Sequence, residues 1–266
     1  MPRTARPAQE VKGIGEAPAA WSESDLASDP HRNEEKADKV RRMFGAIAHR
    51  YDLNNRLHSF GRDRAWRRVA IEEAALRPGD TVLDVACGTG DLALAFARAG
   101  ADRVIGLDFT PQMLDVARHR AERAADTRRV EWIEGDAMAL PQEDASVDIV
   151  TIAFGIRNVT DPARALAEFR RVLRPGGRLV VLEFSEPRSP LIARMNRFWC
   201  STVMPRTATW ISRDTSGAYR YLPRSIETFL DREEMVRSLD AAGFGAITQK
   251  PLTFGVCVCY RGLVLR

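Results

Sequence analysis

The sequence is poor in cysteine and histidine and has no long apolar run. Its 266 residues include four cysteines and four histidines, and no two cysteines have the C-x-x-C spacing of a zinc or redox site. Since no cluster of histidine, cysteine and carboxylate groups stands out, we expect no metal ion. No window approaches the ~18 uninterrupted apolar residues of a membrane span, and the start of the chain lacks the apolar core of a signal peptide. These absences predict a reducing, cytoplasmic compartment and leave only peripheral contact with a membrane.

Neither sign of charge dominates the chain. Forty lysines and arginines face 36 aspartates and glutamates, and the resulting formal charge of +4 is compatible with an anionic ligand, a lipid surface or nucleic acid. Because the excess is small and no basic domain is appended, we expect no nucleic-acid partner. The 45% of hydrophobic and 29% of charged residues are typical of a globular protein and exclude collagen, coiled-coil and disordered chains.

The first part of the chain divides into a polar segment and two helical patterns. Residues 1–35 are rich in Ala, Pro, Ser and mixed charge without periodicity, which predicts a disordered N-terminal tail. From Lys36 onward, apolar side chains recur at three- and four-residue steps and predict a helix. They are Val40, Met43, Phe44, Ile47 and Tyr51. A second amphipathic pattern covers residues 62–76, so residues 36–78 are expected to form N-terminal helices within a domain that covers residues 36–266.

Strand-like and helix-like segments then alternate. Short apolar runs rich in β-branched residues predict strands at residues 81–86, 104–108, 130–134, 147–153 and 178–184. Helical patterns separate them at residues 91–99, 111–125 and 161–173. This alternation predicts βαβ units and a doubly wound α/β sheet. After residue 184 come an insertion, a predicted helix at residues 231–242, and two predicted antiparallel strands at residues 246–249 and 256–264.

A glycine-rich loop lies between the first predicted strand and the first helix that follows it. Gly88 and Gly90 let the backbone approach a ligand closely, and the helix N-terminus offers unpaired N–H groups. Asp108, at the end of the second strand, can accept hydrogen bonds from both hydroxyls of a ribose, and Asp136 follows the third strand. The alternatives are a plain tight turn and solvated carboxylates. The loop lacks the third glycine of the dinucleotide fingerprint and no G-K-[ST] follows, which disfavours NAD and ATP.

The order of these motifs resembles that of the class I S-adenosylmethionine-dependent methyltransferases. The resemblance is carried by L-D-V-A-C-G-T-G at residues 83–90, G-L-D at 106–108, G-D-A at 135–137 and L-R-P-G-G at 173–177. It implies a Rossmann-like, seven-stranded sheet of order 3-2-1-4-5-7-6 with the seventh strand antiparallel, and S-adenosylmethionine as the cofactor. The cofactor-binding residues that it implies are Asp84, Gly88, Thr89, Gly90, Asp108, Asp136, Ala137 and Ala153.

Four further segments resemble the ubiquinone and menaquinone C-methyltransferases. They are R-Y-D-L-N-N at residues 50–55, F-G-I-R-N-V at 154–159, L-E-F-S at 182–185 and Y-R-Y-L-P-R-S-I at 219–226. This resemblance implies methyl transfer to a ring carbon of a polyprenylated quinol. The residues in the first of these segments favour demethylmenaquinol over 2-methoxy-6-polyprenyl-1,4-benzoquinol of ubiquinone biosynthesis. A methyltransferase of another small molecule and a silent binding module are the competing interpretations. The intact 154–159 motif argues against the silent module, and the apolar insertion argues against a soluble substrate.

The implied reaction needs an electron-rich ring carbon, which arises when a quinol hydroxyl loses its proton. Arg157 and Asn158 follow the fourth predicted strand, where a cation and an amide can stabilise a phenolate-like transition state. Asp52, His58 and a water bound to Arg157 are open candidates for the base. The residues expected to bind the substrate are aromatic: Tyr51, Phe154, Phe198, Trp199 and Tyr221.

Structural roles are the alternative for several of these residues. Arg157 can instead form an ion pair with Asp161 or Glu183. Tyr51 and Asp52 can instead cap and pack the N-terminal helix. The sequence leaves both alternatives open.

The insertion, residues 187–226, is predicted to be an α-helical lid over the substrate. One helical face carries the apolar side chains Leu191, Ile192, Met195, Phe198, Trp199 and Val203, and the surrounding arginines are Arg188, Arg194, Arg197 and Arg206. A basic amphipathic segment can rest on an anionic bilayer and receive a lipid tail, which predicts peripheral contact with the inner face of the cytoplasmic membrane. The alternatives are a core-packing helix and a helix that forms a homodimer.

Overall fold

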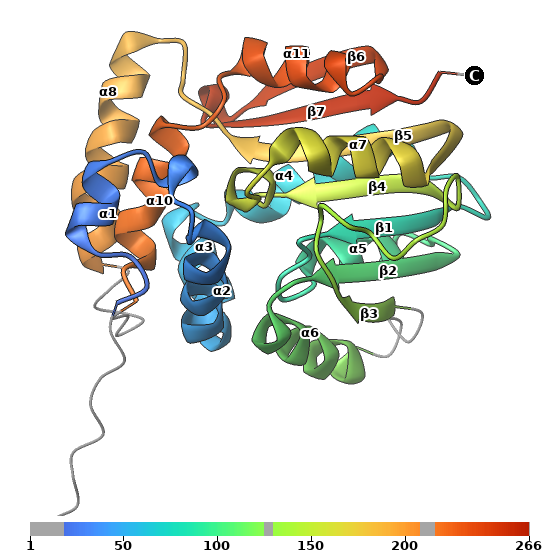
Figure 1. Ribbon diagram of the computed structural model, residues 1–266, viewed down its shortest axis with the longest axis horizontal. Coiled ribbons are helices and arrows are strands. Elements are labelled where there is room, and N and C mark those ends of the chain that lie inside the picture. The colour runs from blue at the N-terminus through green and yellow to red at the C-terminus, as the bar shows by residue number, and fades with distance from the viewer. Residues whose placement is uncertain (1–18, 125–129, 208–215, 266) are drawn as a thin grey trace, which may run out of the picture.

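The computed structural model describes residues 19–124, 130–207 and 216–265. At its centre is a seven-stranded sheet in the order β3-β2-β1-β4-β5-β7-β6 (Figure 1). Its strands are β1 (Thr81–Val85), β2 (Arg103–Asp108), β3 (Val130–Glu134), β4 (Val147–Ala153), β5 (Leu173–Phe184), β6 (Gly245–Leu252) and β7 (Cys257–Leu263). The first five strands are parallel, whereas β7 runs antiparallel to both β5 and β6. This topology confirms the predicted fold.

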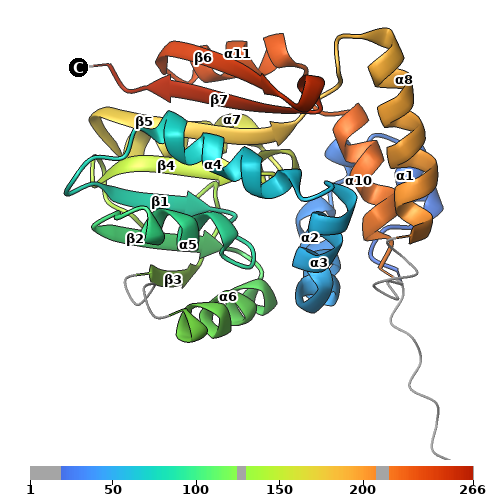
Figure 2. The same cartoon turned by 180° about the vertical axis from the view of Figure 1, so that it is seen from behind.

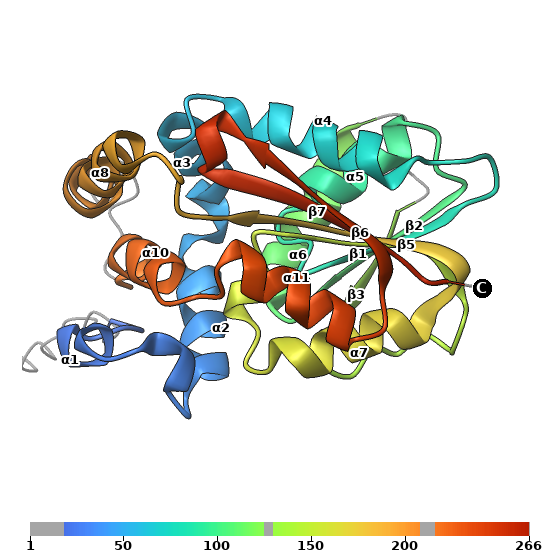
Figure 3. The ribbon, with the colours of Figure 1, turned by 90° about the horizontal axis from the view of Figure 1, so that it is seen from above.

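Helices cover both faces of the sheet (Figure 3). One face is covered by α4 (Arg62–Ala74) and α5 (Asp91–Arg98), and the other by α7 (Pro162–Val172) and α11 (Arg232–Ala241). α6 (Pro111–Arg123) packs beside β2 and β3 at one edge. Because the central strands have no solvent face, their sequences are nearly continuous apolar runs, which is why they could be predicted.

A further group of helices lies at one end of the sheet, beyond the carboxyl ends of the parallel strands (Figure 2). Its α-helices are α1 (Glu23–Ala27), α2 (Lys36–Ile47), α3 (Tyr51–His58), α8 (Pro190–Phe198) and α10 (Ala218–Glu227). Short helical turns join them: η1 (Pro30–Arg32), η2 (Ala48–Arg50) and the π-helical η4 (Trp199–Val203). No helix in the described ranges is long and apolar enough to cross a bilayer. Ligands of open α/β sheets bind at this end, where the chain reverses its winding.

The predicted disorder of residues 1–35 is wrong for residues 19–35. Trp21 is fully buried and stacks on Tyr221 with 4.5 Å between ring centroids. The Lys39 ammonium lies 2.7 Å from Asp25 and 5.7 Å from the centroid of the Trp21 ring. A single buried indole contributes enough apolar area to dock a short segment, yet it leaves no periodicity in the sequence. Residues 1–18, the rest of that predicted tail, lie outside the described residues.

Candidate active site

The glycine loop after β1 is fixed by backbone contacts and by close packing. The Cys87 amide donates to the Leu107 carbonyl at 3.0 Å, which ties the loop to β2. Gly90 has a φ of +83°, and a Cβ there would lie 2.5 Å from the Trp132 ring. Gly88 also has a positive φ of +55°, but the space beside it is open. The loop therefore presents bare backbone toward a cavity at Gly88, while Gly90 serves packing.

A first cavity lies at the carboxyl ends of β1, β2 and β4. Gly88, Asp108, Asp136, Ala137 and Ala153 all line it, as the sequence analysis expected of cofactor-binding residues. The Asp108 carboxylate accepts hydrogen bonds from the amides of Gly88 and Thr110, each at 2.8 Å. Burial raises the pKa of Asp108, and these amides lower it. Asp108 thus sits at the mouth of the glycine loop as a buried acceptor.

Three other residues of the expected cofactor set do not line this cavity. Asp84 is buried in β1, accepts a hydrogen bond from Thr151 at 2.7 Å, and has its pKa raised by burial to about 7. The hydroxyl of Thr89 donates to Asp52. Gly90 packs on Trp132. The side chains of Asp84 and Thr89 bind other parts of the protein and Gly90 has no side chain, so any contact of these three residues with the cofactor is made by the backbone.

A second cavity, rich in aromatic side chains, adjoins the first. Tyr51, Phe44 and Phe154 line both cavities and so form the wall between them. Other apolar side chains that line the second cavity include Met43, Ile47, Trp66, Phe184, Trp199, Met204, Tyr219 and Tyr221. Three of its aromatic rings, Trp66, Phe154 and Phe184, pack together with centroids 4.5 to 6.1 Å apart. The second cavity is suited to a flat apolar ring held next to the first cavity.

Arg157 borders the second cavity but is held in a buried ion pair. Its Nη1 lies 2.7 Å from Glu183 Oε1, and the two side chains are 5% and 2% exposed. The same nitrogen donates to the Phe154 carbonyl at 2.8 Å. Glu183 is thus the ion-pair partner that the sequence left open, whereas Asp161 accepts from the amide of Arg164 as the N-cap of α7. Burial raises the pKa of Glu183, and Arg157 lowers it.

Asn158 and Tyr221 join the insertion to the loop after β4. The Tyr221 hydroxyl donates to Asn158 Oδ1 at 3.0 Å, and Asn158 Nδ2 donates to the Phe154 carbonyl at 3.2 Å. Burial raises the pKa of Tyr221 to about 12, so its phenol stays protonated and remains a donor. This pair places one amide beside the first cavity and one phenol beside the second.

The structure separates the candidates for the base. His58 lines the second cavity, and its ring nitrogens lie 2.8 Å from the Asn54 carbonyl and 2.9 Å from the Thr207 hydroxyl. Asp52 lines neither cavity, because its carboxylate is bound by Thr89 and Arg120.

Among the residues expected to bind the substrate, Phe198 lines neither cavity and has 62% of its surface exposed. Trp199, one residue later, does line the second cavity.

Several cavity residues were missed by the sequence analysis as functional residues. Phe44 is part of a helical period in the sequence and carries no functional expectation there, and Phe184 ends a predicted strand. Phe109 follows the ribose-binding candidate Asp108 directly and lines the first cavity. Position after a strand was the available signal for Phe109 and Phe184, since strand ends converge on the site.

Comparison with known sequences decides the family. The profile described as the ubiE/COQ5 methyltransferase family matches residues 32–264. The chain belongs to this family. It is 45% identical over 230 residues to a demethylmenaquinone methyltransferase of Deinococcus radiodurans, and the match covers 86% of this chain and 94% of that one. A demethylmenaquinone methyltransferase of Thermus thermophilus is 48% identical over 221 residues, covering 83% and 99%.

More distant relatives agree with this placement. The ubiquinone/menaquinone biosynthesis C-methyltransferase UbiE of Geobacter sulfurreducens is 42% identical, covering 87% of this chain and 91% of that one. Among solved structures, a putative methyltransferase from Haloferax volcanii in complex with its Trm112 activator is 22% identical, with a TM-score of 0.60 and coverage of 84% and 98%. A putative methyltransferase of Bacillus halodurans is 21% identical, with a TM-score of 0.56, and the match covers 75% of this chain and 99% of that one. These structural likenesses support the fold alone.

The ubiE/COQ5 family member is an S-adenosylmethionine-dependent C-methyltransferase, and its first cavity fits that cofactor. At Gly88 the positive φ and the empty space beside the backbone leave room that a side chain would fill. Asp108 is a buried carboxylate at the end of β2, where it can accept from ribose hydroxyls. When bound there, S-adenosylmethionine supplies an electrophilic methyl group on a sulfonium. In the described ranges no group of three or more His, Cys, Asp or Glu side chains is arranged to hold a metal ion.

Proposed function

We propose that this protein methylates a ring carbon of demethylmenaquinol, with S-adenosylmethionine as the methyl donor. The observation that carries the proposal is the aromatic second cavity, which meets the cofactor cavity across Tyr51, Phe44 and Phe154. The relatives from Deinococcus radiodurans and Thermus thermophilus, both named demethylmenaquinone methyltransferases, favour a naphthoquinol. The benzoquinol of ubiquinone biosynthesis is the second candidate, because a UbiE relative matches over 91% of its own length.

The reaction must remove one proton overall. A quinol hydroxyl loses its proton, and the ring carbon takes the methyl group as the bond from that methyl group to the sulfonium sulfur breaks. The hydrogen on that carbon then leaves as a proton to restore the aromatic ring, and the quinol oxygen regains a proton. We assign the first proton to His58, because its Nδ1 faces the Asn54 carbonyl and the neutral ring then keeps a lone pair on Nε2. In the structure that Nε2 lies 2.9 Å from the Thr207 hydroxyl, so this contact must open before His58 takes the proton.

Negative charge that develops on the quinol oxygen needs donors. We assign this role to Arg157, whose guanidinium borders the second cavity. The phenol of Tyr221 stays protonated, but its single proton is donated to Asn158 rather than to the quinol. Asn158 holds the Tyr221 hydroxyl through its carbonyl oxygen. The Glu183 carboxylate offsets part of the Arg157 charge, so Arg157 acts here as a fixed dipole with its partner rather than as a lone cation.

Filling the second cavity tests this assignment directly. Met204 is buried and lines only the second cavity, so Met204→Trp should abolish methylation of a quinol while cofactor affinity measured by calorimetry stays within about threefold. The matched control is Leu265→Trp, at an exposed apolar side chain that lines neither cavity, which should leave turnover unchanged. Wild-type turnover in Met204→Trp would show that the substrate binds elsewhere.

We further propose that the protein contacts an anionic bilayer through an apolar surface around this cavity, here called the apolar rim. The rim consists of Leu53, Leu57, Phe60, Leu191, Met195, Phe198 and Phe254, all about half exposed or more. The predicted apolar face of the insertion is thus only partly external, because the π-helical η4 turns Trp199 toward the cavity. Phe60 and Trp199 are in contact, with ring centroids 4.9 Å apart, so the rim is continuous with the cavity wall.

Charge supports a lipid as the occupant of the rim. The segments that carry most of it, residues 53–62 and 190–207, contain arginines but no aspartate or glutamate. The arginines are Arg56, Arg62, Arg194, Arg197 and Arg206. Two of them also have an acidic neighbour, because Arg197 pairs with Glu186 and Arg56 lies near Asp91. Basic and apolar side chains on one surface favour anionic lipids, and a polyprenyl tail in the bilayer could then reach the cavity without crossing water.

Vesicle binding tests the rim. The double variant Phe60→Ser/Phe198→Ser should lose most co-sedimentation with phosphatidylglycerol vesicles, while the exposed Leu265→Ser near the far end of β7 should bind like the wild type. Neutral phosphatidylcholine vesicles should bind the wild type more weakly, because the arginines contribute. If the double variant instead changes a concentration-dependent dimer and leaves vesicle binding intact, the rim is a dimer contact.

A further inference from the structure

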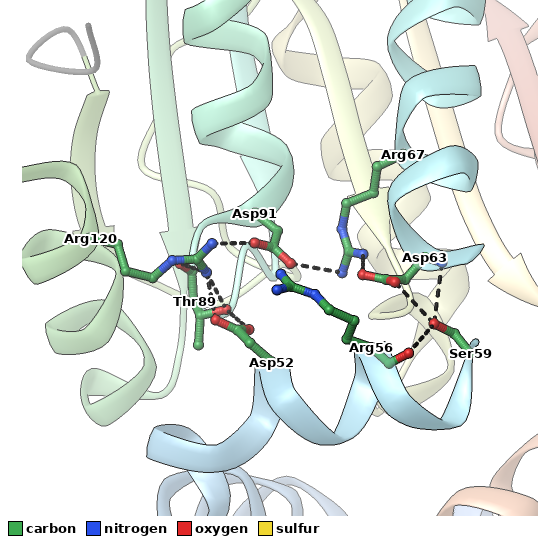
Figure 4. A network of polar contacts seen from close by, with 8 residues as sticks. All are labelled: Asp52, Arg56, Ser59, Asp63, Arg67, Thr89, Asp91 and Arg120. Carbon is green, nitrogen blue, oxygen red and sulfur yellow. Dashed lines mark hydrogen bonds and ion pairs between the residues drawn. The ribbon is translucent and has the colours of Figure 1, made fainter. Parts of the chain in front are cut away.

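A chain of charged side chains joins α3 to the glycine loop after β1, here called the cofactor loop. It combines three arginines and three aspartates with one serine and one threonine (Figure 4). Of its members, Ser59, Asp63 and Arg67 also line the second cavity, whereas Asp52, Asp91 and Arg120 line neither cavity. Asp52 and Arg56 lie on α3, and Ser59 follows that helix as its C-cap. Asp63 and Arg67 lie on α4, and Arg120 lies on α6. Thr89 belongs to the cofactor loop, and Asp91 is the first residue of α5. These elements are distant in sequence, so the contacts fix their relative positions.

Arg120 is the centre of one half of this network. Its Nη1 donates to Asp52 Oδ2 at 2.7 Å and to the Thr89 carbonyl at 2.9 Å, while Nη2 pairs with Asp91. Thr89 adds a hydroxyl hydrogen bond to the other oxygen of Asp52. One guanidinium therefore binds α3, the cofactor loop and the first turn of α5 together. A planar fork of donors suits this task, which a lysine ammonium would not perform equally.

Asp91 continues the network to α4. Its Oδ2 lies 3.7 Å from Arg67, and Arg67 also binds Asp63 at 3.1 Å. Ser59 donates to Asp63 at 3.0 Å just before α4 begins. Asp91 is also the first residue of α5, where a carboxylate interacts favourably with the helix dipole. Through Arg120 and Arg67, α3 and α4 are thus both held against the junction between the cofactor loop and α5.

The helix α3 divides its side chains between the network and the substrate cavity. Tyr51, Asn54, Asn55 and His58 recur at three- and four-residue steps and line the second cavity. Asp52 and Arg56 lie four residues apart on another side of the same helix and face the network. A contact made by Asp52 on one side of α3 therefore determines where Tyr51 and His58 stand on the other.

We propose that Asp52 and Arg120 are positioning residues, which hold the substrate wall of α3 against the cofactor loop so that the quinol carbon lies in line with the methyl group. The inference rests on the proposed function. It replaces the expectation that Asp52 acts as the base, because both oxygens of Asp52 are occupied by Thr89 and Arg120 and neither cavity includes it. Misplacing reacting groups by about 1 Å can cost about 100-fold in rate.

The test compares Arg120→Gln and Asp52→Asn with Arg118→Gln. Arg118 is a matched control, since it is a half-exposed arginine on the same helix that pairs with Asp115 within its own turn. Activity is measured with a naphthoquinol that lacks the tail, so that membrane contact plays no part. Cofactor affinity is measured by calorimetry, and the fraction of folded enzyme is taken from the binding stoichiometry.

Both network variants should lower kcat/KM for the quinol by roughly 10- to 100-fold, while the cofactor Kd changes by less than about threefold. Cofactor affinity should persist because Asp108 and Leu107 also hold the loop. The double variant should have a kcat/KM no lower than that of Arg120→Gln alone. The Asp52–Arg120 contact that Asp52→Asn weakens is already absent from Arg120→Gln. Arg118→Gln should stay within about twofold of the wild type. Asp52→Asn is isosteric, so it also serves if Arg120→Gln does not fold.

Five outcomes would overturn the proposal. Additive losses in the double variant would mean that Asp52 and Arg120 act independently. Loss of the acidic limb of the pH–rate profile in Asp52→Asn would make Asp52 the base, and an equal loss of cofactor affinity would make the network a support of the cofactor loop alone. Unchanged kcat/KM in both variants would leave α3 positioned by other contacts. If the wild type methylates no quinol but binds the cofactor, the proposed function fails and this inference with it.

Discussion

The buried ion pair of Arg157 and Glu183 allows the structural and catalytic roles of Arg157 to be separated. Arg157→Met removes the cation and leaves Glu183, which is 2% exposed, without the partner that lowers its pKa. Breaking a buried pair by removing one member costs about 3–5 kcal/mol of the free energy of unfolding. Total stabilities are about 5–15 kcal/mol, so this single change should be plainly visible in a urea titration.

The double variant Arg157→Met/Glu183→Leu should recover much of that loss. With both charges gone, no buried charge is left uncompensated, and apolar replacements of a buried pair are often neutral or stabilising. The lost hydrogen bonds to the Phe154 carbonyl and to the Phe184 amide each cost about 1 kcal/mol. We therefore expect the double variant to be at least about 1–2 kcal/mol more stable than Arg157→Met.

Turnover should not recover with stability. If the guanidinium stabilises charge on the quinol oxygen, the double variant should fold and bind cofactor but remain roughly 100-fold or more below the wild type in kcat, the usual cost of losing one such donor. Urea unfolding followed by circular dichroism and the methyl-transfer rate are measured on the same preparations. Recovery of turnover together with stability would refute the catalytic role and leave Arg157 as a structural residue.

Three further predictions concern other parts of the chain. Trp21→Ala should cost about 3–5 kcal/mol in urea unfolding because it empties a fully buried, stacked site; a loss below about 1 kcal/mol would detach residues 19–35 from the domain. Burial raises the pKa of Asp84 to about 7, so between about pH 4 and 7 the folded protein binds a proton that the unfolded chain has released. The free energy of unfolding of the wild type should therefore fall, by at most about 4 kcal/mol, as the pH rises from about 4 to 7. Asp84→Asn should lack this fall, and a pH curve parallel to that of the wild type would contradict the assignment. Asp108→Ala should weaken cofactor binding at least about 10-fold by calorimetry, and unchanged affinity would remove the ribose assignment.

Much of the sheet was predictable because its strands are buried on both faces. The predicted bounds 130–134 and 147–153 coincide with β3 and β4. Residues 19–35 were not predictable, since their order depends on one indole that stacks on a side chain 200 residues later. Likewise, the break between α2 and α3 at η2 is invisible in the apolar period, which continues through Tyr51.

The candidate site was predictable where position after a strand was the signal. Asp108, Asp136 and Ala153 follow or end strands, and all three line the first cavity. The role of Asp52 was not predictable, because its partners Thr89 and Arg120 lie on elements that only the folded chain brings together. A charged residue on a short helix looks the same in sequence whether it faces a substrate, a distant arginine or water.

The central claim is tested most directly by methyl transfer from labelled S-adenosylmethionine to two quinols offered side by side. These are reduced demethylmenaquinone and the demethylated benzoquinol precursor of ubiquinone, with the products identified by mass. The account predicts a product one methyl group heavier from demethylmenaquinol, labelled on a ring carbon and formed faster than any benzoquinol product. Absence of product from both quinols, with the cofactor still bound, would contradict it.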